Sequence, residues 1–297
     1  SCSDYPDNGE YSLSVDGVDD YVEIPDHELL SSNGNDFSVL VKFNSTDIQQ
    51  STIVSKYYDA NTKDWGMWID EGSNLHLDFE SNANNFWITV DDIVLESNQD
   101  YAIGFSFNYQ TKLIKVYIDG NEVASETLPV DDLTDTNEPI SIGRAGGVYD
   151  NSYFQGIIDD LTIWNTVVTS NEIQSHMNGS LTGEENGLQG YWNFNEGEGS
   201  TLTDLSGNGN DGIIYGATWS GDYPVPPVFG CTDSLALNFD PLANTDDGSC
   251  CYVSGCTDPT ATNYDPNACY DDGSCIIPSD ILKTGKAFKR DSLLMGK

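Results

Sequence analysis

The sequence predicts an all-β sandwich, because short stretches of alternating apolar and polar residues recur through residues 9–222. Four such stretches, at residues 11–15, 37–41, 75–79 and 114–118, have the period of two that places one face of a strand in a core. Helical signals occur in one short segment of the sequence. Many strands with a single short helix are typical of a sandwich and not of a parallel α/β sheet.

Two local elements can be placed by their end signals. A tight turn is expected at Asp119-Gly120, between two short apolar stretches that would pair as a hairpin. The helix is expected over residues 169–177, where Thr169 and Glu172 have the spacing of a capping box ahead of apolar residues.

The chain is strongly acidic, with 49 acidic and 11 basic residues and a formal net charge of −38. Such a polyanion is repelled by nucleic-acid phosphates and by anionic membrane surfaces, which argues against both as partners. No apolar run approaches the ~20 residues that a membrane-spanning helix needs. The acid excess opposes folding unless salt or bound cations neutralise it, which favours an extracellular setting that contains calcium. Simple solubility is the alternative explanation.

The second part of the chain has a different composition. A Pro-rich stretch is followed by two copies of a Cys- and Asp-rich pattern at a spacing of 25 residues, which is an internal repeat. Five of the basic residues lie in the last 20 positions. The predicted parts are a sandwich at 1–222, a linker at 223–229, the repeats 230–250 and 255–275 within 230–277, and a basic tail at 278–297.

Disulfides are expected in the repeats, because each repeat is too small to bury a core and six of the seven cysteines lie there. Cys231–Cys250 and Cys256–Cys275 are equivalent pairs in the two copies, and we pair Cys251–Cys269 as a hypothesis. Zinc is the competing interpretation, but its usual CxxC pairs are absent from the sequence. Cys2 is left over, as a free thiol, an intermolecular bridge or a lipid attachment point. We expect a mature, exported chain.

Acidic residues recur at the same offsets in both repeats, and calcium prefers such oxygen ligands. The alternative is that Asp-Asp-Gly and Asn-x-Asp-Pro only form turns. The predicted calcium ligands are Asp233, Asn238, Asp240, Asp246 and Asp247 in the first copy and Asp258, Asn263, Asp265, Asp271 and Asp272 in the second.

An ordered set of motifs gives the first part a family resemblance. The set comprises residues 11–25 with Asp16-Gly17, then 116–121, 140–144, 154–165, 190–199, 204–212 and 217–219. Together these segments resemble the concanavalin A-like, laminin G-like jelly-roll domains over residues 9–221. The sequence departs from the family at residues 99–103, where a Trp-His pair is usual. The two repeats resemble tandem Cys/Asp-rich repeats of exported bacterial surface proteins and of some viral structural proteins.

The resemblance implies a jelly-roll β-sandwich with a structural calcium near Asp16, Asp204 and Asn208, joined by Asp159 or Asp160. Ordinary turns explain the same Asp-Gly and Ser-Gly-Asn-Gly sequences equally well.

Aromatic residues among polar ones are candidates for stacking on sugar rings, and Tyr57, Tyr58 and Tyr149 are the best placed. Trp68, which lies between Met67 and Ile69, is expected in the core.

The function that follows is calcium-dependent adhesion or carbohydrate binding, outside the cell or on a cell or virion surface. The expected partners are a glycan, an extracellular protein or other copies of the chain. One alternative is a structural subunit of an extracellular filament or viral appendage; another is an accessory module of a polysaccharide-degrading enzyme. Catalysis is disfavoured, because glycosidases need paired carboxylates and the nearest string, residues 23–28, is interrupted by Pro25.

Overall fold

The computed structural model describes residues 11–32, 34–59, 62–81, 84–129, 133, 135–146, 152–178, 181–221 and 227–277. Only the backbone is described at residues 58, 59, 62, 63, 81, 84, 85, 91, 92, 177 and 178. The chain divides into two compact units, Ser1–Pro227 and Val228–Lys297, and the division falls inside the predicted Pro-rich linker. Tyr149, predicted to bind sugar, lies outside the described residues.

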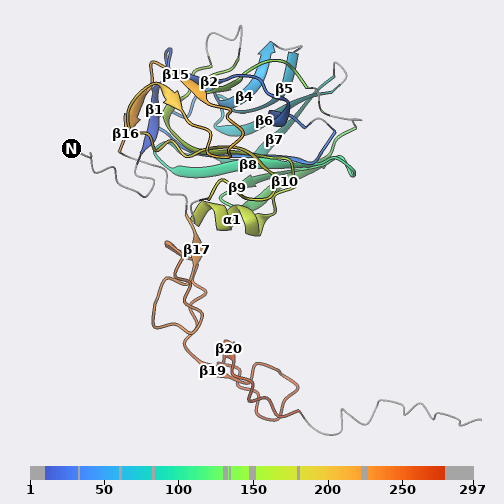
Figure 1. Ribbon diagram of the computed structural model, residues 1–297. Coiled ribbons are helices and arrows are strands. Elements are labelled where there is room, and N and C mark those ends of the chain that lie inside the picture. Colours follow the sequence, from blue (N-terminus) through green and yellow to red (C-terminus); the bar gives the residue numbers. More distant parts are fainter. Residues whose placement is uncertain are drawn as a thin grey trace, which may run out of the picture. The chain divides into compact units, whose positions relative to one another are not determined.

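The first unit is a jelly-roll sandwich of two antiparallel sheets (Figure 1). The first sheet contains, in spatial order, β10 (Asn121–Thr127), β9 (Leu113–Ile118), β8 (Asp100–Asn108), β3 (Phe37–Ser45), β12 (Gln155–Trp164), β1 (Ser12–Asp16) and β16 (Thr218–Ser220), and β13 (Leu188–Trp192) also pairs with β12. The second contains β14 (Thr201–Leu202), β15 (Gly212–Tyr215), β2 (Tyr21–Ile24), β11 (Ile140–Ile142), β4 (Ser51–Asp59), β5 (Thr62–Ile69), β6 (Asn74–Ser81) and β7 (Asn84–Val94). The predicted all-β class is confirmed.

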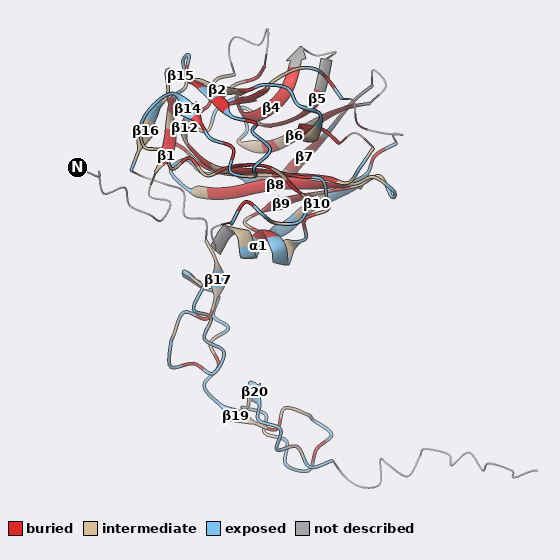
Figure 2. Ribbon diagram, viewed as in Figure 1, coloured by how far each residue is buried: buried red, intermediate tan, exposed pale blue. Residues whose placement is uncertain are grey.

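The core lies between the two sheets, where Figure 2 shows the buried residues. Trp65 of β5 packs 6.2 Å from Phe37 and 6.0 Å from Phe105 of the facing sheet, measured between ring centroids. Phe79 of β6 meets Phe105 edge-on at 5.1 Å. These rings are fully or almost fully buried. Because successive side chains of a strand point to opposite faces, the residues between the core-facing ones on β5 and β6 point away from the core.

The turn and helix signals of the sequence are confirmed. Asp119 and Gly120 both have positive φ, 50° and 73°, as a tight hairpin turn between β9 and β10 requires. The helix α1 spans Ser170–Asn178, one residue later than predicted. Its capping box is formed, because the backbone N–H of Thr169 donates to Glu172 Oε2 at 2.8 Å and Thr169 Oγ1 accepts from the N–H of Glu172 at 3.4 Å.

A buried lysine lies beyond the main core. The Lys56 side chain on β4 has no exposed surface, and its Nζ lies 2.9 Å from Asp26, 3.4 Å from Asp64 and 3.7 Å from Asp135. Burial raises the pKa of Asp64 to about 7, although the Lys56 cation and a hydrogen bond from the Ser31 hydroxyl oppose that shift. This cluster joins β4 and β5 to the segment before the short 3₁₀ helix η1 (Glu28–Leu30) and to the loop before β11.

The second unit is turn-rich and depends on cystine. The three predicted disulfides, Cys231–Cys250, Cys251–Cys269 and Cys256–Cys275, are all formed. Two-stranded parallel pairs complete the copies, β17 (Phe229–Gly230) with β18 (Thr245–Asp246) and β19 (Ser254–Gly255) with β20 (Tyr270–Asp271). The most buried described residues of this unit are cysteines and two alanines, Cys231, Ala236, Cys251, Cys256 and Ala261.

The disulfides indicate an oxidising environment. Among the described residues, no helix has the length and apolar character needed to cross a membrane.

Candidate functional site

A pocket opens on the second sheet, on the side that faces away from the core. Its volume is about 170 Å³, and its described lining consists of Gln50, Ser51, Thr52, Tyr57, Trp68, Asp78, Ala145 and Ser152. These residues come from β4 and the residue before it, from β5 and β6, and from the segment between β11 and β12. Strand register brings these side chains together at the base of the pocket. Thr52 of β4 lies opposite Trp68 of β5. One step along the sheet, Gly66 of β5 lies between Ser55 of β4 and Asp78 of β6.

One wall of the pocket depends on a glycine. A Cβ atom at Gly66 would lie 2.6 Å from Cε1 of Tyr57, so the Tyr57 ring covers Gly66 closely. A second close approach lies beside it, since a Cβ atom at Gly146 would come within 1.8 Å of the Tyr57 carbonyl oxygen. Gly146 and Ser152 are therefore packed directly against β4, and the backbone N–H of Thr52 donates to the Ser152 carbonyl at 2.8 Å.

Trp68 is held rigidly at the pocket. Its ring stacks on the imidazole of His76, with centroids 4.2 Å apart and an interplanar angle of 14°. The two ring nitrogens of His76 are in turn engaged, Nε2 with Asp70 at 2.9 Å and Nδ1 with the Thr89 hydroxyl at 3.0 Å. Burial raises the pKa of Asp70, but hydrogen bonds from Asn74 and His76 outweigh it and lower that pKa below its ordinary value. An ionised Asp70 thus anchors the stack.

Two polar atoms of the pocket residues lack partners. Ser51 Oγ and Trp68 Nε1 are buried, and neither has a hydrogen-bond partner among the described residues. Buried polar atoms are normally paired, since an unpaired one costs about 1–3 kcal/mol. Both atoms have almost no accessible surface, so they face the protein interior and not the open space of the pocket.

The comparison with known families bears on this fold. Residues 16–174, more than half of the chain, match the family model described as the concanavalin A-like lectin/glucanases superfamily. The chain belongs to the concanavalin A-like superfamily. The implied jelly roll is thereby shown, and the departure at residues 99–103 does not disturb it, because β8 occupies Asp100–Asn108.

Several solved structures are similar to this chain. A putative carbohydrate binding protein from Bacteroides ovatus has a TM-score of 0.59 and 17% identity, over 72% of this chain and 61% of that one. A heptameric SAP-like pentraxin from Limulus polyphemus has a TM-score of 0.44 and 17% identity, over 57% and 83% of the two chains. Domain 4 of an extracellular arabinanase from Geobacillus stearothermophilus, in complex with arabinotriose, has a TM-score of 0.43 and 21% identity, over 55% and 75%. At 17% identity, the likeness to the Bacteroides ovatus protein shows the fold alone.

One curated protein shares a short segment with this concanavalin A-like chain. The chloroplastic ribulose bisphosphate carboxylase/oxygenase activase of Oryza sativa subsp. japonica is 60% identical over 43 residues. The match spans 14% of this chain and 9% of the rice protein.

The structure separates the predicted calcium ligands of the concanavalin A-like unit. Asp16 lies opposite Gln155 at one end of β1, whereas Asp159 lies beyond the Ile158–Leu13 pair near the other end, so these two do not converge. Asp204 is saturated, because its two oxygens accept hydrogen bonds from the backbone N–H groups of Tyr191, Ser206 and Asn210 and from the Asn210 amide. Asn208 donates to the Gln189 carbonyl at 2.9 Å.

Asp16 instead belongs to a local carboxylate cluster. Asp16, Asp19 and Asp20 each place one carboxylate oxygen within 4.8 Å of the other two. Among the described residues, this is the one group of three Asp, Glu, His or Cys side chains with such spacing. Asp16 Oδ1 accepts from the backbone N–H groups of Val18 and Asp19, and Asp20 Oδ2 accepts from the N–H of Asp16. Burial, followed by repulsion from the Asp16 and Asp19 charges, raises the pKa of Asp20.

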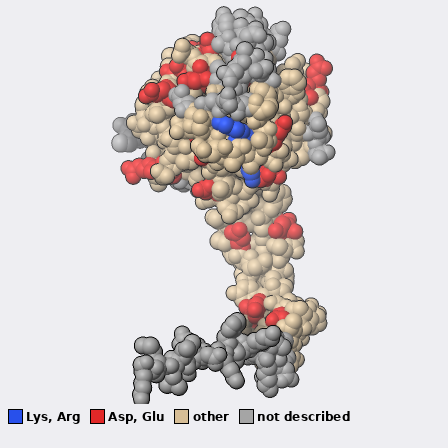
Figure 3. Space-filling model, turned by 90° about the vertical axis from the view of Figure 1, so that its right-hand side faces the viewer, with Lys and Arg blue, Asp and Glu red and all other residues tan. Residues whose placement is uncertain are grey.

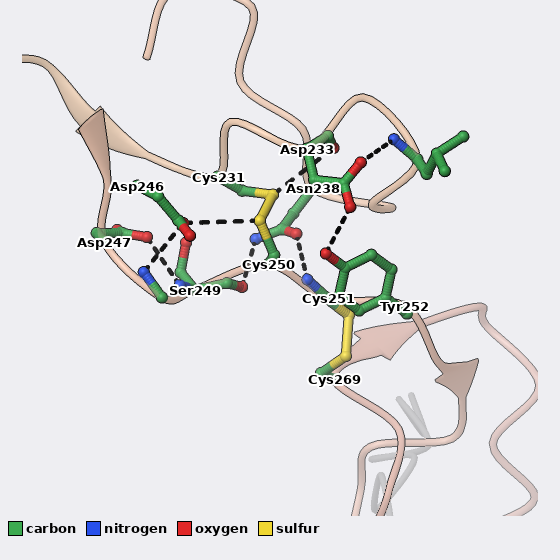
Figure 4. Close-up of a disulfide and its surroundings, with 12 residues drawn as sticks. Cys231, Asp233, Asn238, Asp246, Asp247, Ser249, Cys250, Cys251, Tyr252 and Cys269 are labelled. Carbon is green, nitrogen blue, oxygen red and sulfur yellow. Dashed lines mark hydrogen bonds between the residues drawn. A yellow bond between two sulfur atoms is a disulfide. The ribbon is translucent and has the colours of Figure 1, made fainter. Parts of the chain in front are cut away.

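The repeat carboxylates organise their own turns (Figure 4). Asp246 accepts from the N–H of Gly248 at 3.1 Å and Asp247 from Ser249 at 2.8 Å. Asp271 and Asp272 form the same bonds with Gly273 and Ser274 in the second copy. Such bonds account for these acids as turn residues, and calcium binding by the repeats stays a prediction.

The other predicted repeat ligands also have local partners. Asn238 and Asn263 each use both amide atoms to join the middle of a repeat to its end, donating to the carbonyls of Ser249 and Ser274 and accepting from the N–H groups of Cys251 and Ile276. Asp233, Asp240, Asp258 and Asp265 accept from N–H groups two residues ahead. A hydrogen bond from the N–H of Leu235, supported by the Tyr252 hydroxyl, lowers the pKa of Asp233.

The aromatic predictions had mixed outcomes. Tyr57 lines the pocket, although little of it is exposed. The side chain of Tyr58 lies outside the described ones. The expectation that Trp68 belongs to the core is wrong, because Met67 and Ile69 face the core and adjacent strand residues face opposite sides.

Sequence reasoning missed the polar residues of the pocket, among them Ser51 and Asp78. The alternation of β5 and β6 was the available signal, since core residues at 65, 67, 75 and 77 place positions 66, 68, 76 and 78 on the other face.

Proposed function

We propose that the chain is a non-catalytic carbohydrate-binding protein that holds a sugar residue in the pocket on β4, β5 and β6. The observation that carries the proposal is the combination of an immobilised indole, Trp68, with a carboxylate, Asp78, and hydroxyl groups around one small pocket. A pyranose ring has an apolar C–H face and a rim of hydroxyl groups, so it needs an aromatic surface beside hydrogen-bonding groups. The ring of Trp68 supplies the aromatic surface.

The polar lining suits hydroxyl recognition. Asp78 can accept hydrogen bonds from sugar hydroxyls, and the Gln50 amide and the Ser152 hydroxyl are further polar groups of the lining. The volume of about 170 Å³ is that of roughly six bulk water molecules, at ~30 Å³ each, which suits one small ring. The Trp68 and Tyr57 rings are held in place, Trp68 by its stack on His76 and Tyr57 by its contact with Gly66. Binding a sugar would therefore cost little side-chain ordering.

The charges favour an uncharged sugar. The described lining contains one carboxylate and no lysine or arginine. Five basic side chains of the first unit are described, and each has an internal partner: Lys42 with Asp160, Lys56 with Asp64, Lys112 with the Tyr109 ring, Lys115 with Glu122 and Arg144 with Glu23. Acidic side chains are spread over the face shown in Figure 3. A sialic or uronic acid in the pocket would be repelled by the Asp78 carboxylate and by the acidic surface of the chain.

Trp68→Ala is the direct test of this pocket. We expect a glycan array to detect binding of neutral glycans by the intact chain, and we expect the variant to bind them at least about ten-fold more weakly, since it loses the stacking surface. Asp78→Asn against Glu198→Gln is a matched pair, because each removes one carboxylate and only Asp78 lines the pocket. Equal affinities for all four proteins, measured by calorimetry with folding verified by circular dichroism, would rule out this pocket.

We also propose that calcium binds the loop of Asp16, Asp19 and Asp20, outside the cell. Three carboxylates offer up to six oxygens of the kind calcium prefers, and a bound cation would relieve the repulsion that raises the pKa of Asp20. Asp20 is 9% exposed, and a Cβ atom at Gly216 would lie 2.0 Å from its Oδ1, so glycine is required beside this carboxylate.

Calcium is expected to raise the melting temperature of the sandwich, and EDTA to reverse the change, because an ion that binds only the folded state stabilises it. Asp19→Asn should weaken the response, whereas Asp211→Asn, in a different loop, should retain it. A melting temperature that is the same in calcium and in EDTA would contradict the proposal.

A further inference from the structure

Trp87 is a large apolar side chain that the fold leaves in water. It lies on β7, the edge strand of the second sheet, and 66% of its surface is exposed. The next residue, Ile88, and Val90 lie in the core, so Trp87 is on the outer face of the sheet. Tryptophan is highly buried on average and is enriched at binding interfaces, so an exposed indole beside a polar pocket is a candidate contact for a ligand.

Register places Trp87 beside the pocket. Gly66 of β5 lies opposite Asp78 of β6, and Asp78 lies opposite Trp87 of β7. Residues directly opposite in antiparallel strands share a face, with their Cβ atoms about 4.5–5.5 Å apart. Because Asp78 lines the pocket, the Trp87 side chain starts one strand outward from the lining. Trp68 on β5 and Trp87 on β7 are separated by two strand spacings of about 4.8 Å each, so one sugar ring does not reach both and a longer glycan can.

We propose that Trp87 forms a second sugar-binding subsite, which stacks on the residue next to the one held in the pocket. The ligand class is therefore an oligosaccharide of at least two neutral sugars that crosses β5, β6 and β7. This inference rests on the proposed function. Asp78 then lies between the ring on Trp68 and the ring on Trp87, where its carboxylate can accept hydrogen bonds from the hydroxyl groups of either sugar.

Two features favour a sugar over a second copy of the chain as the occupant. Trp87 is continuous with the polar pocket through Asp78, whereas contacts between copies at an edge strand form through free backbone groups along the strand. The chain also carries a net charge of −38, which opposes close approach of two copies.

The experiment compares sugars of increasing length. The probes are glucose, galactose, mannose and N-acetylglucosamine, each with its linear dimer and trimer, titrated by NMR into the full chain and into Trp87→Ala, Trp87→Phe and Trp68→Ala. For the recognised sugar we expect the dimer to bind the intact chain about ten-fold more tightly than the monomer. Trp87→Ala should abolish that difference while leaving monomer affinity within about two-fold, and Trp87→Phe should retain part of it. Trp68→Ala should weaken both. Ile213→Ala is the control, an exposed apolar residue on β15.

The outcomes separate the two proposals. If monomer and dimer bind equally well, or if Trp87→Ala leaves their ratio unchanged, the second subsite is wrong and the pocket stands. If no probe binds at all, the proposed function itself fails. If Trp87→Ala changes only the sedimentation of the chain, Trp87 is a contact between copies, which also overturns the subsite.

Discussion

Lys56→Met is expected to destabilise the sandwich by about 3–5 kcal/mol, because it leaves carboxylates buried without their cation. Asp64 is fully buried and loses the nearest positive charge, while Asp26 and Asp135 lose the group that draws their segments onto β4. The measurement is chemical denaturation of the full chain, followed by tryptophan fluorescence.

The effect of Lys56→Met should depend on pH in a defined direction. The pKa of Asp64 in the folded protein, about 7, lies above its ordinary value of 3.8. A raised pKa means that the folded state favours the protonated form, so stability is greatest at low pH and is lost as pH rises towards 7. Removing Lys56 raises this pKa further. The variant should therefore be closer to the intact chain at pH 5 than at pH 8.

Two further variants make this prediction specific. Lys56→Met with Asp64→Asn should recover part of the loss, because the second substitution removes the unpaired buried charge. Lys115→Met is the surface control, since the Lys115–Glu122 pair is solvent-exposed, and such pairs contribute about 0–1 kcal/mol. Similar losses for Lys56→Met and Lys115→Met would show that the buried cluster has no special role.

Cys256→Ser with Cys275→Ser is expected to unfold the second repeat while the sandwich remains intact. The disulfide closes a loop with a sequence separation of 19, and such a loop is worth about 3 kcal/mol in the chain-entropy model. No apolar core replaces it, because Tyr264, Tyr270 and Ile276 of this repeat are exposed. Limited proteolysis should then cleave between residues 256 and 275, without a change in the melting temperature of the sandwich.

The disulfide between the copies provides the comparison. Cys251→Ser with Cys269→Ser leaves Cys231–Cys250 and Cys256–Cys275 in place, so each repeat keeps its own closed loop. We expect this variant to resist proteolysis inside both repeats better than the first. Equal cleavage of the two variants would mean that the bridge between the copies, and not the loop within each, maintains the unit.

Local signals in the sequence were sufficient for much of the fold. The helix at Ser170–Asn178 and the turn at Asp119-Gly120 depend on side chains within four residues of one another. Two disulfides of the repeats followed from equivalence between the two copies, and the third from the two repeat cysteines that have no counterpart in the other copy. The cluster of Asp16, Asp19 and Asp20 is equally local, because the three acids are neighbours in the sequence.

What the sequence determined by itself was the all-β class, the repeated cystine frame and the acidic character, since periodicity, spacing and composition need no knowledge of distant contacts. The tertiary structure alone decided where function can lie. Pairing of β4, β5 and β6 brings Tyr57, Trp68 and Asp78 around one pocket, and the register of β7 adds Trp87 beside it. The same holds for Lys56, whose partners are separated along the chain. Strand register and loop packing arise from the energy of the whole core, which no short segment encodes.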